Sequence, residues 1–92
     1  MKVTLKCGGY LRTLFGQEQE QVDLPENSTL QDLLYWIEEH HASAFPPRLW
    51  DFGEHSFRNP VVLVVNGKTA PDCTTPLRES EEVVALYPVA GG

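Results

Sequence analysis

The chain is poor in basic residues. Only seven of its 92 residues are Lys or Arg, against 13 Asp or Glu, which gives a formal net charge of −6. Binding to nucleic acid is driven by clustered Lys and Arg that release counterions from phosphates. The seven basic residues are scattered singly, so they predict no nucleic-acid partner. An acidic surface instead favours a protein partner with a basic docking face, and it would accelerate their encounter.

Cysteine is scarce, and long apolar runs are absent. Cys7 and Cys73 show neither CxxC spacing nor a disulfide-rich pattern, so we expect two reduced thiols. The longest apolar stretch, residues 61–65, is too short to cross a bilayer. The first residues lead directly into a strand pattern instead of a signal peptide. These features predict a cytoplasmic protein with no membrane partner.

The residue sets that support intrinsic catalysis or metal binding are also missing. The sequence has no Ser/His/Asp arrangement and no phosphate-binding loop. His40 and His41 are adjacent, so on a helix they would point about 100° apart and could not bind one metal ion together. His55 is distant in sequence. We therefore expect no metal site, no intrinsically bound cofactor and no enzymatic activity.

Alternating apolar and polar residues predict two strands near the start of the chain. Val3, Leu5 and Cys7 alternate with polar residues, which is typical of a half-buried strand. A second alternating segment at residues 19–24 is predicted to form a hairpin with the first strand. Residues 10–15 between them predict a short helical turn or loop.

The clearest element is a helix over residues 29–41. Ser28 and Gln31 have the spacing of a capping box, which satisfies backbone N–H groups at a helix start. The apolar residues repeat at i, i+3, i+4 and i+7, which is one stripe of a helix: Leu30, Leu33, Leu34 and Ile37.

The second half of the chain predicts a long loop followed by strands. Residues 42–60 have no clean period and predict an ordered loop, with one helical turn near residues 48–51 and aromatic side chains over the core. Residues 61–65 are a β-branched run, typical of a strand buried on both faces. Asn66-Gly67 is a strong hairpin signal. Residues 83–87 predict the last strand.

The predicted order is β-β-α-β-β-β, with one capped helix early and strands around it. This is an α+β arrangement, the β-grasp or ubiquitin-like fold, in which one main helix packs across a mixed sheet of four or five strands. The first and last strands would pair in parallel at the centre of the sheet. We expect one domain over residues 1–87 and a flexible C-terminal Gly-Gly tail over residues 88–92.

Five segments together resemble motifs of the prokaryotic sulfur carriers, the MoaD/ThiS-like family that includes the small subunit of molybdopterin synthase. In chain order they are residues 11–16, 28–34, 65–67, 78–83 and 83–92. Two departures leave the pathway open. Residues 42–60 form a longer segment than in the most compact members, and Tyr87 stands where many molybdopterin-synthase subunits carry a second proline.

The resemblance implies carrier chemistry at the C-terminus. In this family an E1-like adenylyltransferase of the MoeB/ThiF type uses ATP and Mg²⁺ to adenylate the terminal carboxylate, and sulfur then displaces AMP to leave a thiocarboxylate. By resemblance, Gly92 carries the reactive carboxylate. Gly91 would give clearance in the partner's channel because it lacks a Cβ, and Pro88 would stiffen the base of the tail. The alternative is that Gly91-Gly92 is an ordinary frayed terminus.

A docking surface is predicted on the last strand. Strand parity places Val84 and Leu86 on the sheet face opposite the helix. The alternative is that residues 42–60 cover these two side chains. Arg12 matches the family's arginine and is predicted either to pair with acidic groups of a partner or to be an exposed loop residue. The residues predicted to contact the activating enzyme and the acceptor, such as the molybdopterin synthase large subunit, are Val84, Leu86, Pro88, Val89, Ala90 and Arg12.

The sequence is compatible with three functions: a sulfur carrier, a protein modifier and an interaction domain. For the sulfur carrier, two groups of pathways are considered. Sulfur transfer for molybdopterin (molybdenum or tungsten cofactor) biosynthesis ranks first, followed by sulfur supply for tRNA thiolation, thiamine or cysteine synthesis. A ubiquitin-like modifier that forms isopeptide bonds through Gly92 shares the same activation step. The third is an interaction domain with an incidental tail.

Overall fold

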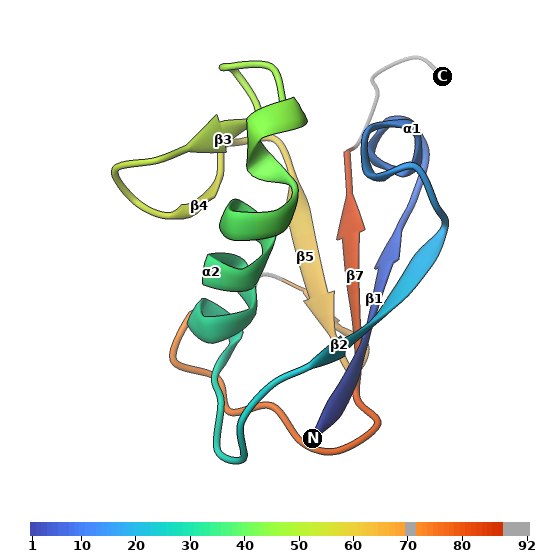
Figure 1. The fold of residues 1–92 in the computed structure, drawn as a ribbon, viewed down its shortest axis with the longest axis vertical. Helices are drawn as coiled ribbons and strands as arrows, with labels where there is room; N and C mark the ends of the chain where they lie inside the picture. The colour runs from blue at the N-terminus through green and yellow to red at the C-terminus, as the bar shows by residue number, and fades with distance from the viewer. Residues whose placement is uncertain (70–71, 88–92) are drawn as a thin grey trace.

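Five strands form a mixed sheet in the order β2-β1-β7-β5-β6, and one long helix crosses a single face of it (Figure 1). The computed structural model describes residues 1–69 and 72–87. Within these residues the sheet strands are β1 (Lys2–Cys7), β2 (Gln19–Asp23), β5 (Val62–Val65), β6 (Lys68–Thr69) and β7 (Glu82–Leu86). The other elements are α1 (Tyr10–Phe15), α2 (Leu30–His40), the 3-10 turn η1 (Ala42–Ala44) and a hairpin of β3 (Trp50–Asp51) and β4 (Ser56–Phe57).

The centre of the sheet confirms the predicted pairing of the first and last strands. β1 and β7 run parallel, with Leu5 opposite Val83. On the outer sides of this pair, β2 is antiparallel to β1 and β5 is antiparallel to β7. The predicted β-grasp fold is therefore confirmed. Because β7 lies between β1 and β5, its direction is fixed on both sides. No helix among the described residues has the length and apolar character needed to span a membrane.

Thr29 caps the start of α2. Its backbone N–H donates to Asp32 Oδ2 at 2.8 Å, and the Thr29 side chain in turn accepts from the backbone of Asp32, which makes a capping box. The predicted capping box of Ser28 and Gln31 is therefore wrong by one residue. Ser28 is buried, and its hydroxyl donates to the Pro25 carbonyl at 2.7 Å, so it closes the turn that precedes the helix.

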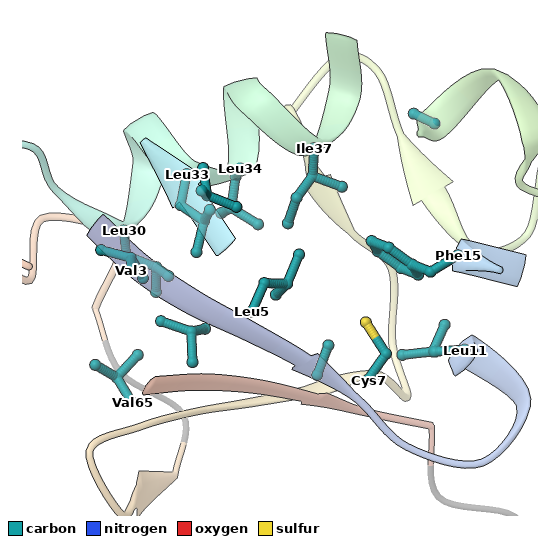
Figure 2. Packing of buried hydrophobic residues seen from close by; sticks show 14 of the residues in the cluster. Val3, Leu5, Cys7, Leu11, Phe15, Leu30, Leu33, Leu34, Ile37 and Val65 are labelled. Atoms are coloured by element: carbon teal, nitrogen blue, oxygen red, sulfur yellow. The ribbon is translucent and has the colours of Figure 1, made fainter. Parts of the chain in front are cut away.

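The apolar stripe of α2 forms the core with the sheet (Figure 2). Val3 and Leu5 of β1 lie opposite the stripe and are at most 1% exposed. Removing one buried leucine side chain from such a core typically costs about 2–5 kcal/mol. This packing holds the helix against the sheet and leaves the other sheet face uncovered by it. The stripe residues are all fully buried: Leu30, Leu33, Leu34 and Ile37.

The segment 42–60 is ordered as predicted, but its local structure differs. The helical turn predicted near residues 48–51 is displaced: Leu49 N–H donates to the Pro46 carbonyl at 2.9 Å to close a single turn, and Trp50 and Asp51 form β3, which pairs with β4. Asp51 explains the hairpin, since its Oδ1 accepts from the backbone N–H groups of Gly53 and Glu54 at 2.8 and 3.0 Å.

The aromatic side chains of this segment divide between core and surface. Phe45 and Trp50 are buried, as predicted, and their ring centroids lie 5.9 Å apart. Phe52 is 58% exposed, so it does not cover the core. The segment thus extends the core beside α2 and also presents one apolar side chain to solvent.

The prediction that residues 61–65 are buried on both faces is wrong. Only Val65 of β5 is buried, and the other β5 residues are half-buried. The reason is that β5 lies beside the two-residue edge strand β6, and α2 covers just one face of the sheet. The predicted hairpin is confirmed: Asn66 and Gly67 have φ angles of 53° and 85°, as a type I′ turn requires.

Candidate docking surface and C-terminal segment

β7 presents one face to the core and the other to solvent. Val83 and Ala85 are fully buried under α2, whereas Val84 is half-buried and Leu86 is 41% exposed on the opposite face. The predicted parity of this strand is confirmed. Segment 42–60 does not cover Leu86, and its hairpin lies beside α2 (Figure 1). The alternative in which this segment shields the outer side chains is therefore wrong.

Four aliphatic side chains form an outer apolar patch on β5 and β7, which we define as Val62, Val64, Val84 and Leu86. Val62 is opposite Leu86 and Val64 is opposite Val84 in the antiparallel pairing, so all four point to the same face. Val62 and Val64 were not predicted as part of this surface, because a β-branched run such as 61–65 is typical of a strand buried on both faces. The Asn66-Gly67 turn sets the register of this pair of strands and was the signal that could have found them.

Polar groups of β1 and β2 border the outer apolar patch. Lys6 is in register with Val84, and its Nζ lies 3.0 Å from Glu82 Oε2. Both charged side chains are more than 40% exposed, so this ion pair contributes about 0–1 kcal/mol to stability. Next to it, Gln21 Nε2 donates to Thr4 Oγ1 at 3.1 Å. An apolar centre with a polar rim is the usual composition of a protein-binding surface.

Arg12 lies on α1 and not on the sheet face. Its side chain is exposed and forms no ion pair with any residue in the described ranges. The structure therefore does not bring Arg12 into the outer apolar patch. Its predicted pairing with a partner's acidic groups stays a prediction.

The described part of the C-terminal region ends at Tyr87, one residue after the patch residue Leu86. The ring of Tyr87 packs edge-to-face against that of Tyr10, with centroids 5.5 Å apart. The remaining site residues lie outside the described residues, and their roles stay predictions: Pro88, Val89, Ala90, Gly91 and Gly92.

Burial makes one cysteine a poor nucleophile. Cys7 is 4% exposed, and burial, followed by the negative charge of Glu20, raises the pKa of its thiol to about 12. Cys73 is half-buried and free. In residues 1–69 and 72–87, no three His, Cys, Asp or Glu side chains converge as metal ligands.

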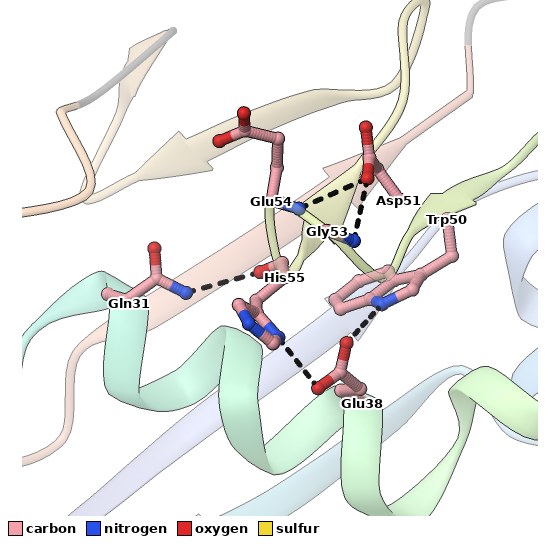
Figure 3. Close-up of polar contacts among 7 residues, drawn as sticks. All are labelled: Gln31, Glu38, Trp50, Asp51, Gly53, Glu54 and His55. Carbon is pink, nitrogen blue, oxygen red and sulfur yellow. Dashed lines mark hydrogen bonds and ion pairs between the residues drawn. The ribbon is translucent and has the colours of Figure 1, made fainter.

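A polar cluster joins the β3–β4 hairpin to α2 (Figure 3). Glu38 accepts a hydrogen bond from Trp50 Nε1 at 2.9 Å, and its other oxygen lies 2.9 Å from His55 Nδ1. Gln31 Nε2 donates to the His55 carbonyl at 3.1 Å. These three contacts join side chains of α2 to the hairpin. The cluster is therefore a structural attachment, and it lies on elements other than the patch strands.

The profile of the ThiS family matches residues 9–92 of the sequence. This chain belongs to the ThiS family. The family match includes the Gly91-Gly92 end, and it confirms the resemblance to MoaD/ThiS-like carriers on which the carrier hypothesis rests. Small carriers of this kind are generally not catalysts themselves. No curated protein sequence matches the chain.

Solved structures with the same fold come from proteins with several roles. The ThiS-family chain is similar to SAMP1 from Haloferax volcanii, with a TM-score of 0.82, 21% identity and 100% coverage of both chains. It is similar to the putative molybdopterin converting factor subunit 1 from Pyrococcus furiosus, with a TM-score of 0.76, 26% identity and coverage of 97% and 99%. A chain of the BexX/CysO complex from Amycolatopsis orientalis has a TM-score of 0.68, 24% identity and coverage of 98% and 99%.

Proposed function

We propose that this ThiS-family chain is a sulfur carrier whose Gly92 carboxylate is adenylated and then converted to a thiocarboxylate. The observation that carries the proposal is the family match over residues 9–92, which takes in Gly91 and Gly92. The fold supports it, because β7 is held between β1 and β5 and leads directly to the segment 88–92. The chain would supply geometry, and its partners would supply catalysis.

The proposed chemistry requires activation, because a carboxylate at neutral pH is a poor electrophile. A Gly92 carboxylate oxygen attacks the α-phosphorus of ATP and pyrophosphate leaves, with Mg²⁺ and ATP held by an E1-like adenylyltransferase. The terminal sulfur of a persulfide then attacks the acyl carbon and AMP leaves. A thiol reductant cleaves the resulting S–S bond, which leaves the thiocarboxylate on Gly92. The absent side chain of Gly91 allows close approach of the partner's backbone to this end of the chain.

The outer apolar patch supports docking of the activating and acceptor enzymes. Leu86 and Val84 present aliphatic surface two and four residues before position 88, so a partner that binds there is close to the reacting end. Apolar side chains at the centre of such a surface commonly contribute most of the binding free energy. The acidic net charge of −6 suits a partner with a basic rim and would speed the encounter.

Molybdopterin biosynthesis is the pathway we propose first. The Pyrococcus furiosus neighbour, described as a putative molybdopterin converting factor subunit 1, is 26% identical over 97% of this chain. The acceptor would then be a large catalytic subunit of the molybdopterin synthase type. Sulfur supply for cysteine, thiamine or tRNA thiolation uses the same loaded carrier, with specificity set by the acceptor.

Protein modification through Gly92 is the second candidate function. The similarity to a small archaeal modifier protein, SAMP1, at a TM-score of 0.82 favours it. A modifier would show Gly92-dependent covalent ladders in cell extract, formed by isopeptide bonds to lysines of other proteins. A carrier alone would show none.

Adenylation is the step that tests both candidates against a plain interaction domain. The purified chain is incubated with an E1-like adenylyltransferase, Mg²⁺, ATP and labelled pyrophosphate, and exchange of label into ATP is measured. We expect exchange with the native chain and none when one residue is added after Gly92. A Phe52→Ala variant, changed at an exposed residue of the hairpin, is the control and should retain exchange. Equal exchange by the native and extended chains would overturn the proposal.

A further inference from the structure

The turn from β1 to α1 packs directly against the end of β7. Gly8 N–H donates to the Ala85 carbonyl at 3.1 Å, which extends the parallel ladder past its last register pair. Gly9 then adopts φ 57° and ψ −127°, a conformation that is accessible to glycine and strained for other residues. The N–H of Leu11 donates to the Gly8 carbonyl at 3.2 Å, so α1 begins at once. The turn thereby carries Tyr10 to the end of β7.

Both residues that precede position 88 are held by this turn. A Cβ on Gly8 would lie 2.9 Å from Leu86 Cδ2, so Leu86 packs directly on the Gly8 backbone. Tyr10 packs edge-to-face on Tyr87 at an interplanar angle of 72°, a favoured aromatic geometry. Tyr87 is also packed against the core cluster, whereas Tyr10 is 36% exposed. Tyr10 can therefore be changed without opening the core.

We propose that Tyr10 is a positioning residue for the carrier reaction: its ring fixes the chain at Tyr87, the residue from which the segment 88–92 must reach a docked partner. This inference rests on the proposed function. Only five residues follow Tyr87, so the position of Tyr87 limits where the reacting carboxylate can be placed in a docked active site. Loss of the ring contact would leave Tyr87 held only by its packing against the core cluster, and the freedom gained would have to be lost again in each productive complex.

The test compares adenylation kinetics of Tyr10→Ala, Tyr10→Phe and native chains with an E1-like adenylyltransferase. Because docking uses the outer apolar patch, we expect an unchanged KM and a kcat lower by about tenfold for Tyr10→Ala, equal to about 1.4 kcal/mol, the cost of ordering roughly one residue. Tyr10→Phe keeps the edge-to-face contact and should restore kcat. Tyr35→Ala is the matched control, since Tyr35 is 48% exposed on α2 and should leave both constants unchanged.

A second measurement separates the failure of this inference from the failure of the proposed function. The backbone ¹⁵N order parameter of Tyr87 reports the Tyr10–Tyr87 contact without any enzyme, and we expect it to fall from about 0.85 to below about 0.6 in Tyr10→Ala only, while that of Leu86 in β7 stays near its native value. An unchanged order parameter of Tyr87, a kcat within twofold of native, or an effect confined to KM would overturn the role of Tyr10. If the native chain is not adenylated but the order parameter of Tyr87 falls in Tyr10→Ala, the proposed function is wrong, whereas the role of Tyr10 in holding Tyr87 is confirmed.

Discussion

Trp50 donates its indole N–H to Glu38 Oε1 at 2.9 Å, and this bond joins β3 to the last turn of α2. The hydrogen bond from Trp50 and the contact with His55 hold the pKa of the Glu38 carboxyl below its ordinary value of 4.5. Both contacts favour the charged carboxylate. Attachment of the hairpin to the helix is therefore coupled to the ionisation of Glu38.

The first prediction concerns stability at acid pH. Because the pKa of Glu38 is lower in the folded state, its stabilising contribution is complete above about 4.5 and is lost as the pH falls through the folded-state value. Glu38→Gln should be less stable than native at neutral pH and should lose less stability on acidification. Urea unfolding at neutral pH and below pH 4.5, followed by circular dichroism, measures both effects.

Glu39→Gln is the control for this experiment, because Glu39 is the exposed neighbour of Glu38 and makes neither of the Glu38 contacts with the hairpin. Its free energy of unfolding should change with pH as that of the native chain does. If Glu38→Gln loses as much free energy of unfolding on acidification as the native chain, the contacts of Glu38 with the hairpin do not control stability at acid pH.

The second prediction concerns docking through the outer apolar patch. Leu86→Asp places a charge in the patch at the end of β7 that leads to the reacting segment, so affinity for the E1-like adenylyltransferase should fall at least about tenfold. Since Leu86 is 41% exposed, the free energy of unfolding should change by less than about 1 kcal/mol. Calorimetric titration measures the affinity. Phe52→Asp, at a residue that is 58% exposed in the β3–β4 hairpin and does not belong to the outer apolar patch, should bind as native does. Equal losses in both variants would point to charge alone and not to the patch.

The third prediction concerns the two thiols. With the pKa of Cys7 raised to about 12 from 9.0, its thiolate fraction at neutral pH is lower by about 10³, and burial also blocks access. Iodoacetamide should label the folded chain once, at Cys73, and twice after unfolding. Peptide mapping by mass spectrometry identifies the site, and Cys73→Ser should abolish fast labelling. Rapid labelling of Cys7 in the folded chain would contradict the buried position of this thiol.

Local patterns predicted the parts of the fold that depend on local chemistry. The period of Leu30, Leu33, Leu34 and Ile37 is a property of one helix, and the Asn66-Gly67 turn needs only two residues with positive φ, so both predictions were confirmed. The cap was misplaced because Ser28 and Thr29 are both good caps, and the choice depends on tertiary contacts. Ser28 donates to Pro25 and is buried, which leaves Thr29 as the cap.

The features that the sequence did not predict depend mainly on which residues lie beside each other in the folded chain. Val62 and Val64 belong to the docking patch because they pair with Leu86 and Val84 and so point to the sheet face opposite α2. The contact between Tyr10 and Tyr87 joins residues 77 positions apart in sequence, and no local pattern encodes it. The hairpin at β3 and β4 was missed because its strands have two residues each, too few for a period to show.

The central claim is that Gly92 carries sulfur. Its most direct test is intact-mass spectrometry of the purified chain after incubation with an E1-like adenylyltransferase, ATP, Mg²⁺, a persulfide donor and a thiol reductant. The account predicts a species in which one carboxylate oxygen is replaced by sulfur, located at Gly92 by fragmentation and absent from a chain that lacks Gly92. A chain that is adenylated under these conditions and yet returns only to the carboxylate mass would contradict it.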